Sequence, residues 1–120
     1  MEKILFICYP KCSTCQKAAK WLKENNIEVE SRHIVENTPT EKELTDWFER
    51  SKLPINKFFN TSGKVYKEQN IKEKVKTEST SGLIKLLSNN GMLIKRPLLI
   101  TKDFVLVGFN EGEWNQHLKS

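Results

Sequence analysis

One segment, KILFICYPKCSTCQKAAKWLKEN, constrains the fold more than any other part of the chain. Its first six residues form a short run rich in β-branched and aromatic side chains, which Pro10 stops, and this predicts a buried strand over 3–8. Apolar residues then recur at helical spacing and predict an amphipathic helix over 13–25. The apolar face of that helix consists of Ala18, Ala19, Trp21 and Leu22. A turn that carries cysteines joins the two elements.

The next segments predict a second strand and a second helix. Loose alternation of apolar and polar residues over 27–35 predicts a strand, which should run parallel to the first because a helix makes the crossover. Thr40 stands three residues before Glu43, which is the spacing of a capping box and predicts that a helix starts here. Its buried face is marked by Leu44, Trp47 and Phe48.

The remaining patterns complete a mixed α/β order. Short helices are predicted over 55–61 and 64–70, with Gly63 between them, and another over 82–88 that ends at Asn-Asn-Gly. RPLLIT and FVLVGF, separated by Lys-Asp, predict an antiparallel hairpin, and NEGEWNQHL predicts a closing helix. The fold class is therefore α/β, a thioredoxin-like (glutaredoxin-like) mixed sheet with a helical insert, in a single domain over 1–120.

Composition excludes several classes of protein. With 38% hydrophobic and 29% charged residues, the 120-residue chain is typical of a folded domain rather than a disordered one. No apolar run approaches the roughly 20 residues of a membrane span, and ILFIC is too short for a signal peptide, so we expect a cytoplasmic protein that does not bind membranes. The net charge of +5 comes from lysines mixed with glutamates, as in KEQNIKEKVKTE, so we expect no direct nucleic-acid binding. No feature of the sequence suggests an oligomer, so we expect a monomer.

The three cysteines, Cys8, Cys12 and Cys15, lie too close together to form a disulfide framework for the whole fold. Cys12 falls at the predicted start of the helix, where free N–H groups and the helix dipole stabilise a thiolate. Lys11 and Lys17 add positive charge. Cys15 follows one turn later on the same face. The spacing predicts that Cys12 attacks an electrophilic sulfur, oxygen or oxyanion centre and that Cys15 resolves the product.

Two other interpretations of the cysteines stay open. A Cys-x-x-Cys can be half of a zinc site, for which Cys8, His33 and His117 are the remaining candidate ligands, but a second Cys-x-x-Cys is missing and we favour no metal. Cys8 is more simply a buried core residue. The cysteines can also be incidental in a binding module. The aromatic residues are predicted to be core rather than a cofactor platform, namely Trp21, Trp47, Phe58, Phe59 and Trp114.

Four segments resemble the arsenate reductase and Spx (ArsC-like) family: YPKCSTCQKAAKWL, FFNTSGKVYKE, NNGMLIKRPLLI and LVGFNEGEW. The resemblance implies a thioredoxin-like fold with a helical insert and a chain that lies between the two groups in a less characterised branch. It implies that Cys12 attacks the substrate, with glutathione or glutaredoxin as the reductant and no bound cofactor. Arg96 then offers an anion-binding fork, and Pro97 is the cis-proline of the family rather than only a tolerated proline at a strand start.

The departures from the family pattern shape the expected function. Where the reductases carry two further arginines, this chain has Asn60 and, in VLVGFNEG, no arginine, so we expect Asn60, Thr61 and Ser62 to offer hydrogen bonds on the substrate side. The resemblance therefore implies a glutathione- or glutaredoxin-linked reductase of a small oxyanion or a disulfide, with weak or no arsenate reduction. The alternative is an Spx-type redox-sensing regulator that binds the RNA polymerase α C-terminal domain, although Pro54 stands where Spx proteins carry a contact glycine.

Overall fold

The computed structural model describes residues 3–119. The chain groups into two compact units: unit 1 contains Met1–His33 and Arg96–Ser120, and unit 2 contains Ile34–Lys95. Unit 2 is the helical insert that the resemblance implies, because it enters the chain of unit 1 between two strands and consists of helices. The expectation of a single domain concerns whether the two units unfold together, and it stays a prediction.

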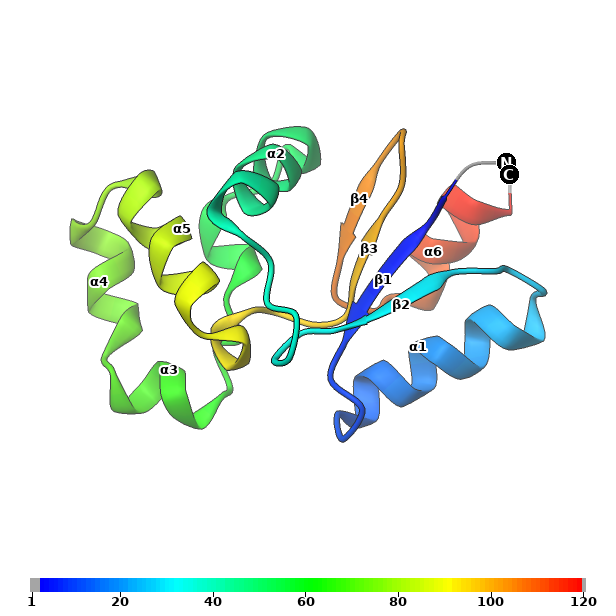
Figure 1. Ribbon diagram of the computed structural model, residues 1–120, viewed down its shortest axis with the longest axis horizontal. Helices are drawn as coiled ribbons and strands as arrows, with labels where there is room; N and C mark the ends of the chain where they lie inside the picture. Colours follow the sequence, from blue (N-terminus) through cyan, green and yellow to red (C-terminus); the bar gives the residue numbers. More distant parts are fainter. Residues whose placement is uncertain (1–2, 120) are drawn as a thin grey trace. The chain divides into compact units, whose positions relative to one another are not determined.

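Unit 1 contains a four-stranded mixed sheet and two helices (Figure 1). The strands are ordered β2-β1-β3-β4, with β1 and β2 parallel and the other two pairs antiparallel. The elements are β1 (Leu5–Cys8), α1 (Ser13–Glu24), β2 (Glu30–His33), β3 (Leu98–Ile100), β4 (Val105–Val107) and α6 (Glu111–Leu118). The predicted fold class, the parallel pair and the C-terminal hairpin are confirmed.

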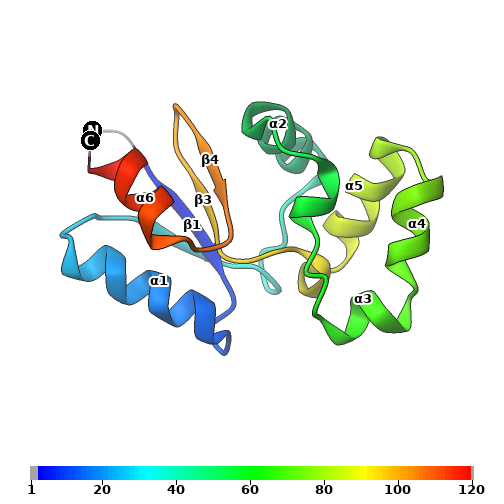
Figure 2. The ribbon, with the colours of Figure 1, turned by 180° about the vertical axis from the view of Figure 1, so that it is seen from behind.

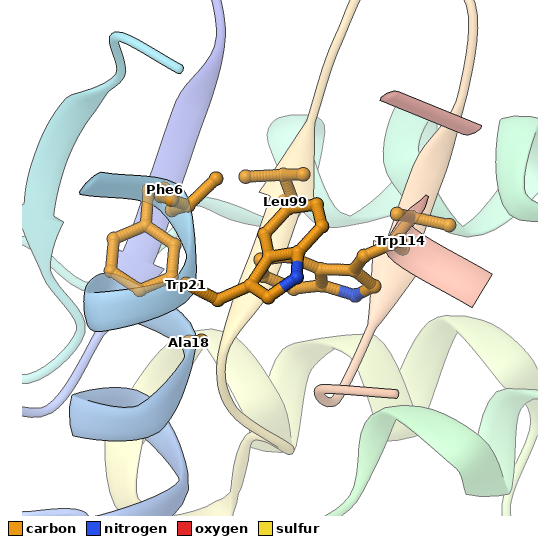
Figure 3. Packing of buried hydrophobic residues seen from close by; sticks show 7 residues of the cluster. Phe6, Ala18, Trp21, Leu99 and Trp114 are labelled. Atoms are coloured by element: carbon orange, nitrogen blue, oxygen red, sulfur yellow. The ribbon is translucent and has the colours of Figure 1, made fainter. Parts of the chain in front are cut away.

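Both helices of unit 1 pack on one face of the sheet. Phe6, Leu99 and Leu106 are cross-strand neighbours and therefore share a face. They form one buried cluster with α1 and α6, in which the indole rings of Trp21 and Trp114 lie 6.0 Å apart at 81° (Figure 3). The Trp114 Nε1–H also donates a hydrogen bond to the Gly108 carbonyl at 3.1 Å. The predicted core role of the tryptophans in this unit is confirmed.

Unit 2 is helical (Figures 1 and 2). Its elements are α2 (Glu41–Ser51), η1 (Ile55–Phe58), α3 (Lys64–Glu68), α4 (Ile71–Thr77), α5 (Thr80–Asn89) and η2 (Gly91–Leu93). α2 packs against α5, and α3 against α4. The predicted capping box is present, because the Thr40 hydroxyl accepts from the Glu43 N–H at 3.1 Å and the Glu43 carboxylate accepts from the Thr40 N–H at 3.0 Å. Trp47, Phe58 and Phe59 are buried, as predicted.

Gly91 lets two backbone segments of unit 2 approach closely. It is buried at the start of η2, and a Cβ there would overlap the Ile34 carbonyl oxygen and lie 2.9 Å from the Ile34 carbonyl carbon. Nearby, the Lys95 N–H donates to the Phe58 carbonyl at 2.8 Å, and Phe59 bridges to Ile94. Only a residue without a side chain fits between these segments.

Several predicted boundaries were wrong. The 55–61 helix ends at Phe58, because Phe59 turns into the bridge with Ile94. The 64–70 helix ends at Glu68, and α4, which was not predicted, starts after Asn70 in the left-handed region at φ 52°. Strand 27–35 shrinks to the four residues that pair with β1. Ala19 is exposed rather than on the buried face of α1. No helix among residues 3–119 is long and apolar enough to span a membrane.

Candidate functional site

A tight turn joins the end of β1 to the start of α1. The Cys12 N–H donates to the Tyr9 carbonyl at 2.9 Å, which closes a four-residue turn with Pro10 in its second position, where proline is favoured. The Gln16 side chain then donates from Nε2 to the Pro10 carbonyl at 2.9 Å. The first turn of the helix therefore braces the loop that presents Cys12.

Cys12 is the N-cap residue of α1, as predicted. Its backbone is extended and its side chain makes no capping hydrogen bond, so its sulfur does not accept from the backbone N–H groups of the first turn. The first turn of α1 contains no acidic residue, and Lys11 and Lys17 are exposed on either side. The positive end of the helix is thus not neutralised locally, which suits an anionic sulfur or substrate. The role of Cys12 as nucleophile stays a prediction.

Cys15 lies on the buried face of α1 and contacts both other cysteines. Only 2% of its surface is exposed, and its sulfur accepts a hydrogen bond from the Tyr9 N–H at 3.3 Å. The thiols of Cys8 and Cys12 are near enough to affect the pKa of Cys15. All three cysteines are free of disulfides. Cys8, Cys12 and Cys15 are therefore neighbours, and we call them the thiol cluster.

Cys8 differs from its prediction as a buried core residue. It is the last residue of β1 and only partly buried, at the edge of the aromatic cluster of unit 1. The hydrogen bond from Cys15 lowers the pKa of Cys8 to about 7, although burial and the nearby Cys12 act in the opposite direction. The same hydrogen bond, together with burial, raises the pKa of Cys15. Near neutral pH the Cys8 thiol is therefore partly ionised, whereas the Cys15 thiol keeps its proton.

We expect alkylation of Cys8 to rise with pH around a midpoint near 7, because only the thiolate reacts. Cys15→Ala removes the donor and should move this midpoint upward, towards the ordinary thiol range of about 8.5. Cys15→Ser keeps a hydroxyl donor and should restore part of the shift. Iodoacetamide labelling followed by mass spectrometry measures it. An unchanged midpoint in Cys15→Ala would show that the hydrogen bond does not control Cys8.

Tyr9 connects the cysteine turn to the predicted anion-binding residue. The Arg96 guanidinium carbon lies 5.3 Å from the centre of the Tyr9 ring, within the range of a cation–π contact. The Tyr9 ring also meets His33 edge-on at 5.8 Å. The Arg96–Pro97 peptide bond is cis, as the resemblance implies, and the Pro97 carbonyl accepts from the Gly108 N–H at 2.8 Å. Arg96 therefore stands beside the loop that carries Cys12, and the contact residue Tyr9 was not predicted.

The other predicted substrate-side residues lie in unit 2. The Asn60 N–H donates to the Leu93 carbonyl at 2.7 Å, and the Ser62 hydroxyl donates to the Asn60 side chain at 3.3 Å. Thr61 and Ser62 are exposed. Thr61 also lines a cavity of about 340 Å³ within this unit. Since these residues and the thiol cluster belong to different units, their role towards a substrate stays a prediction.

The histidines proposed as zinc ligands have other neighbours. His33 meets Tyr9, and the ring of the exposed His117 lies 4.9 Å from that of Phe104. Within the described part of the chain, residues 3–119, no three His, Cys, Asp or Glu side chains are grouped in a way that suits a metal ion. The observed contacts of Cys15 are with thiols and a backbone N–H, which is an arrangement for thiol chemistry.

The mixed sheet with a helical insert, the helix that starts at a Cys-x-x-Cys and the cis-proline define a thioredoxin-like protein. The chain belongs to the ArsC family, whose model matches residues 8–117.

Its relatives agree with this assignment. The uncharacterised protein YusI of Bacillus subtilis is 46% identical over 95% of this chain and 97% of its own. The global transcriptional regulator Spx of Streptococcus agalactiae is 31% identical over 87% of this chain and 74% of its own. A crystal structure of an ArsC-family-related protein from Bacteroides fragilis is 55% identical and covers 95% of this chain and 96% of its own, with a TM-score of 0.92. The resemblance found in the sequence is confirmed.

Proposed function

We propose that the protein is a cytoplasmic thiol–disulfide oxidoreductase in which Cys12 is the nucleophile and Cys15 the resolving thiol. The observation that carries the proposal is the placement of the two cysteines at the start of α1. One sulfur stands at the helix N-cap and the other is buried one turn further on. The Cys12 sulfur can therefore react with a substrate, and the Cys15 sulfur can then resolve the mixed disulfide that forms on Cys12.

The reaction balances as two exchanges. The Cys12 thiolate attacks one sulfur of a disulfide substrate, forms a mixed disulfide and releases the first substrate thiol after protonation. Cys15 then attacks the Cys12 sulfur and its proton passes to the departing second thiolate, which leaves the Cys12–Cys15 disulfide. Two glutathione molecules return the pair to thiols and leave as glutathione disulfide. Lys11, Pro97 and the Tyr9-supported Arg96 shape the side where an anionic substrate approaches.

Arsenate is expected to be a poor substrate. A tetrahedral oxyanion needs several cationic or N–H donors, and Arg96 is the only arginine that the family pattern places at the site. Asn60, Thr61 and Ser62, the other residues that the resemblance assigns to the substrate side, carry no charge. A disulfide substrate does not require this concentration of positive charge, so we favour disulfide reduction.

We expect Cys12→Ser to reduce the activity to the uncatalysed background, because a serine hydroxyl is not ionised at neutral pH. The assay is reduction of bis(2-hydroxyethyl) disulfide by glutathione, coupled to glutathione reductase, with circular dichroism to confirm folding. Cys15→Ser should still form the mixed disulfide with glutathione, which mass spectrometry detects. A Cys12→Ser protein as active as the parent would refute the proposal.

A redox-sensing regulator is the second candidate, favoured by the 31% identity to Spx. In this function the Cys12–Cys15 disulfide is a signal without turnover, and the partner is the RNA polymerase α C-terminal domain. Pro54 is exposed in unit 2, at the position where the Spx proteins have their contact glycine. A pull-down with that domain separates the candidates: no binding of either the reduced or the oxidised protein removes the regulator.

A further inference from the structure

The topology of unit 1 brings Cys8 to Cys15 independently of Cys12. Along β1, alternate residues share a face, so Cys8 follows Phe6 on the face that α1 covers. Along α1, Cys15 precedes Ala18 and Leu22 on the side that faces the sheet. The last residue of the strand and the first buried residue of the helix therefore meet at one end of the helix–sheet interface.

We infer that Cys8 is a third redox-active thiol, which forms an alternative disulfide with Cys15. The inference deepens the proposed function and rests on it, because it concerns the fate of the Cys12–Cys15 disulfide. The Cys15 sulfur lies 3.3 Å from the N–H nitrogen of Tyr9, the residue that follows Cys8, and one helical turn from Cys12, so it is the sulfur at which two alternative partners compete.

The exchange needs no external oxidant. The Cys8 thiolate attacks the Cys15 sulfur of the Cys12–Cys15 disulfide, a Cys8–Cys15 bond forms, the Cys12–Cys15 bond breaks, and Cys12 leaves as a thiolate. The protein remains oxidised by the same two electrons. Because Cys15 has no S–H to donate while it is in a disulfide, the attacking species is the fraction of Cys8 that ionises as an ordinary thiol. The disulfide thus moves from the Cys12–Cys15 pair to the Cys8–Cys15 pair, and the Cys12 thiol becomes free to react with a second substrate.

The sequence provides a direct way to separate the two disulfides. Trypsin cleaves after lysine, so Lys3, Lys11 and Lys17 divide the region into peptide 4–11, which contains Cys8, and peptide 12–17, which contains the other two cysteines. A Cys12–Cys15 disulfide stays inside one peptide. A disulfide to Cys8 links the two peptides. The full-length protein is equilibrated in glutathione buffers, quenched with acid and N-ethylmaleimide, digested and analysed by mass spectrometry.

We expect linked peptides in the oxidised parent protein and none in Cys8→Ser. In Cys12→Ser the linked Cys8–Cys15 pair should form at least about tenfold more readily than the Cys8–Cys12 pair of the matched control Cys15→Ser, a difference of about 30 mV for a two-electron couple. Circular dichroism shows that each variant is folded, and Cys12→Ala replaces Cys12→Ser if the latter is not.

The outcomes distinguish the inference from the proposed function. A Cys12–Cys15 disulfide without linked peptides, together with Cys12→Ser that stays reduced, would overturn the role of Cys8 and leave the oxidoreductase intact. Linked peptides in Cys12→Ser with no disulfide inside peptide 12–17 of Cys8→Ser would support the Cys8–Cys15 pair and overturn the proposed Cys12–Cys15 chemistry.

Discussion

Replacing Trp114 with alanine is expected to lower the free energy of unfolding by about 3–5 kcal/mol. The side chain is fully buried and its ring meets those of Phe6, Trp21 and Phe109 at 4.9 to 6.4 Å. The substitution removes these contacts and leaves a cavity between α6 and the sheet (Figure 3). Since small domains are stable by only about 5–15 kcal/mol, the loss is a large fraction of the total. Urea denaturation followed by circular dichroism measures it.

Trp114→Phe is the matched control, since it keeps an aromatic ring and removes the indole N–H. The Gly108 carbonyl then loses the hydrogen bond that it accepts at 3.1 Å, at an expected cost of about 1–3 kcal/mol. The order of stability should be parent, Trp114→Phe, Trp114→Ala. If Trp114→Ala loses less than about 1 kcal/mol, the cluster does not hold α6 on the sheet as described.

Replacing Gly91 with alanine is expected to destabilise the protein by about 3 kcal/mol or more, at the upper end of the range for overpacked sites. The added methyl group would overlap the carbonyl group of Ile34, and backbone atoms have little room to move away. The cost therefore comes from displacement of η2 or of the segment after β2. The measurement is the shift in the thermal midpoint, which falls by several degrees for each kcal/mol.

Gly112→Ala is the control for Gly91→Ala. Gly112 lies inside α6, where a Cβ would meet only the Asn110 side chain at an ordinary 3.4 Å. Alanine at a helical position of this kind should stabilise by about 0.5–1 kcal/mol, because glycine loses more backbone entropy on folding. The same substitution thus has opposite signs at the two glycines. A neutral Gly91→Ala would mean that the approach to Ile34 is not required for folding.

The element order of unit 1 was predictable from local patterns. The apolar run before Pro10, the helical spacing after Cys12 and the paired runs around Lys-Asp each predicted the correct element. The ends of the strands were not predictable, because a strand ends where its partner ends. β2 stops at His33 because it pairs residue for residue with β1, which stops at Cys8. Such limits are set by pairing between distant segments rather than by local composition.

The helices of unit 2 were less predictable. The sequence IKEKVKT has many charges and only one side chain, Ile71, that α4 buries, so its apolar periodicity is weak. Asn70 separates α4 from α3 and has a left-handed backbone conformation. Asparagine permits this conformation but does not require it, so the sequence alone does not predict the break. In contrast, the capping box at Thr40 combines two reciprocal hydrogen bonds within four residues, and it was predicted correctly.

The place of the candidate site in the chain was predictable, but the contacts among its side chains were not. The spacing of Cys12 and Cys15 placed both thiols at the start of a helix. The contact between Cys8 and Cys15 depends on which face of β1 the helix covers, and the stacking of Arg96 on Tyr9 depends on the return of the chain at β3. One signal was available in the sequence: three cysteines within eight positions, at the end of a strand and the start of the next helix, are more than a Cys-x-x-Cys requires.

The order of segments along the chain also sets the order in which the protein can be completed during synthesis. Unit 2 is one continuous segment, so all of its residues are available while the last part of unit 1 is still missing. β1 pairs with β3 through Leu5 and Ile100, which requires closure of a very long loop and predicts comparatively slow folding of that pair. Until then β1 has only β2 beside it, and α1 lacks Leu99, Leu106 and Trp114 as packing partners. The nascent chain therefore carries its three cysteines before the structure that surrounds them is complete, and the pKa of Cys8 reaches its lowered value only when that structure forms.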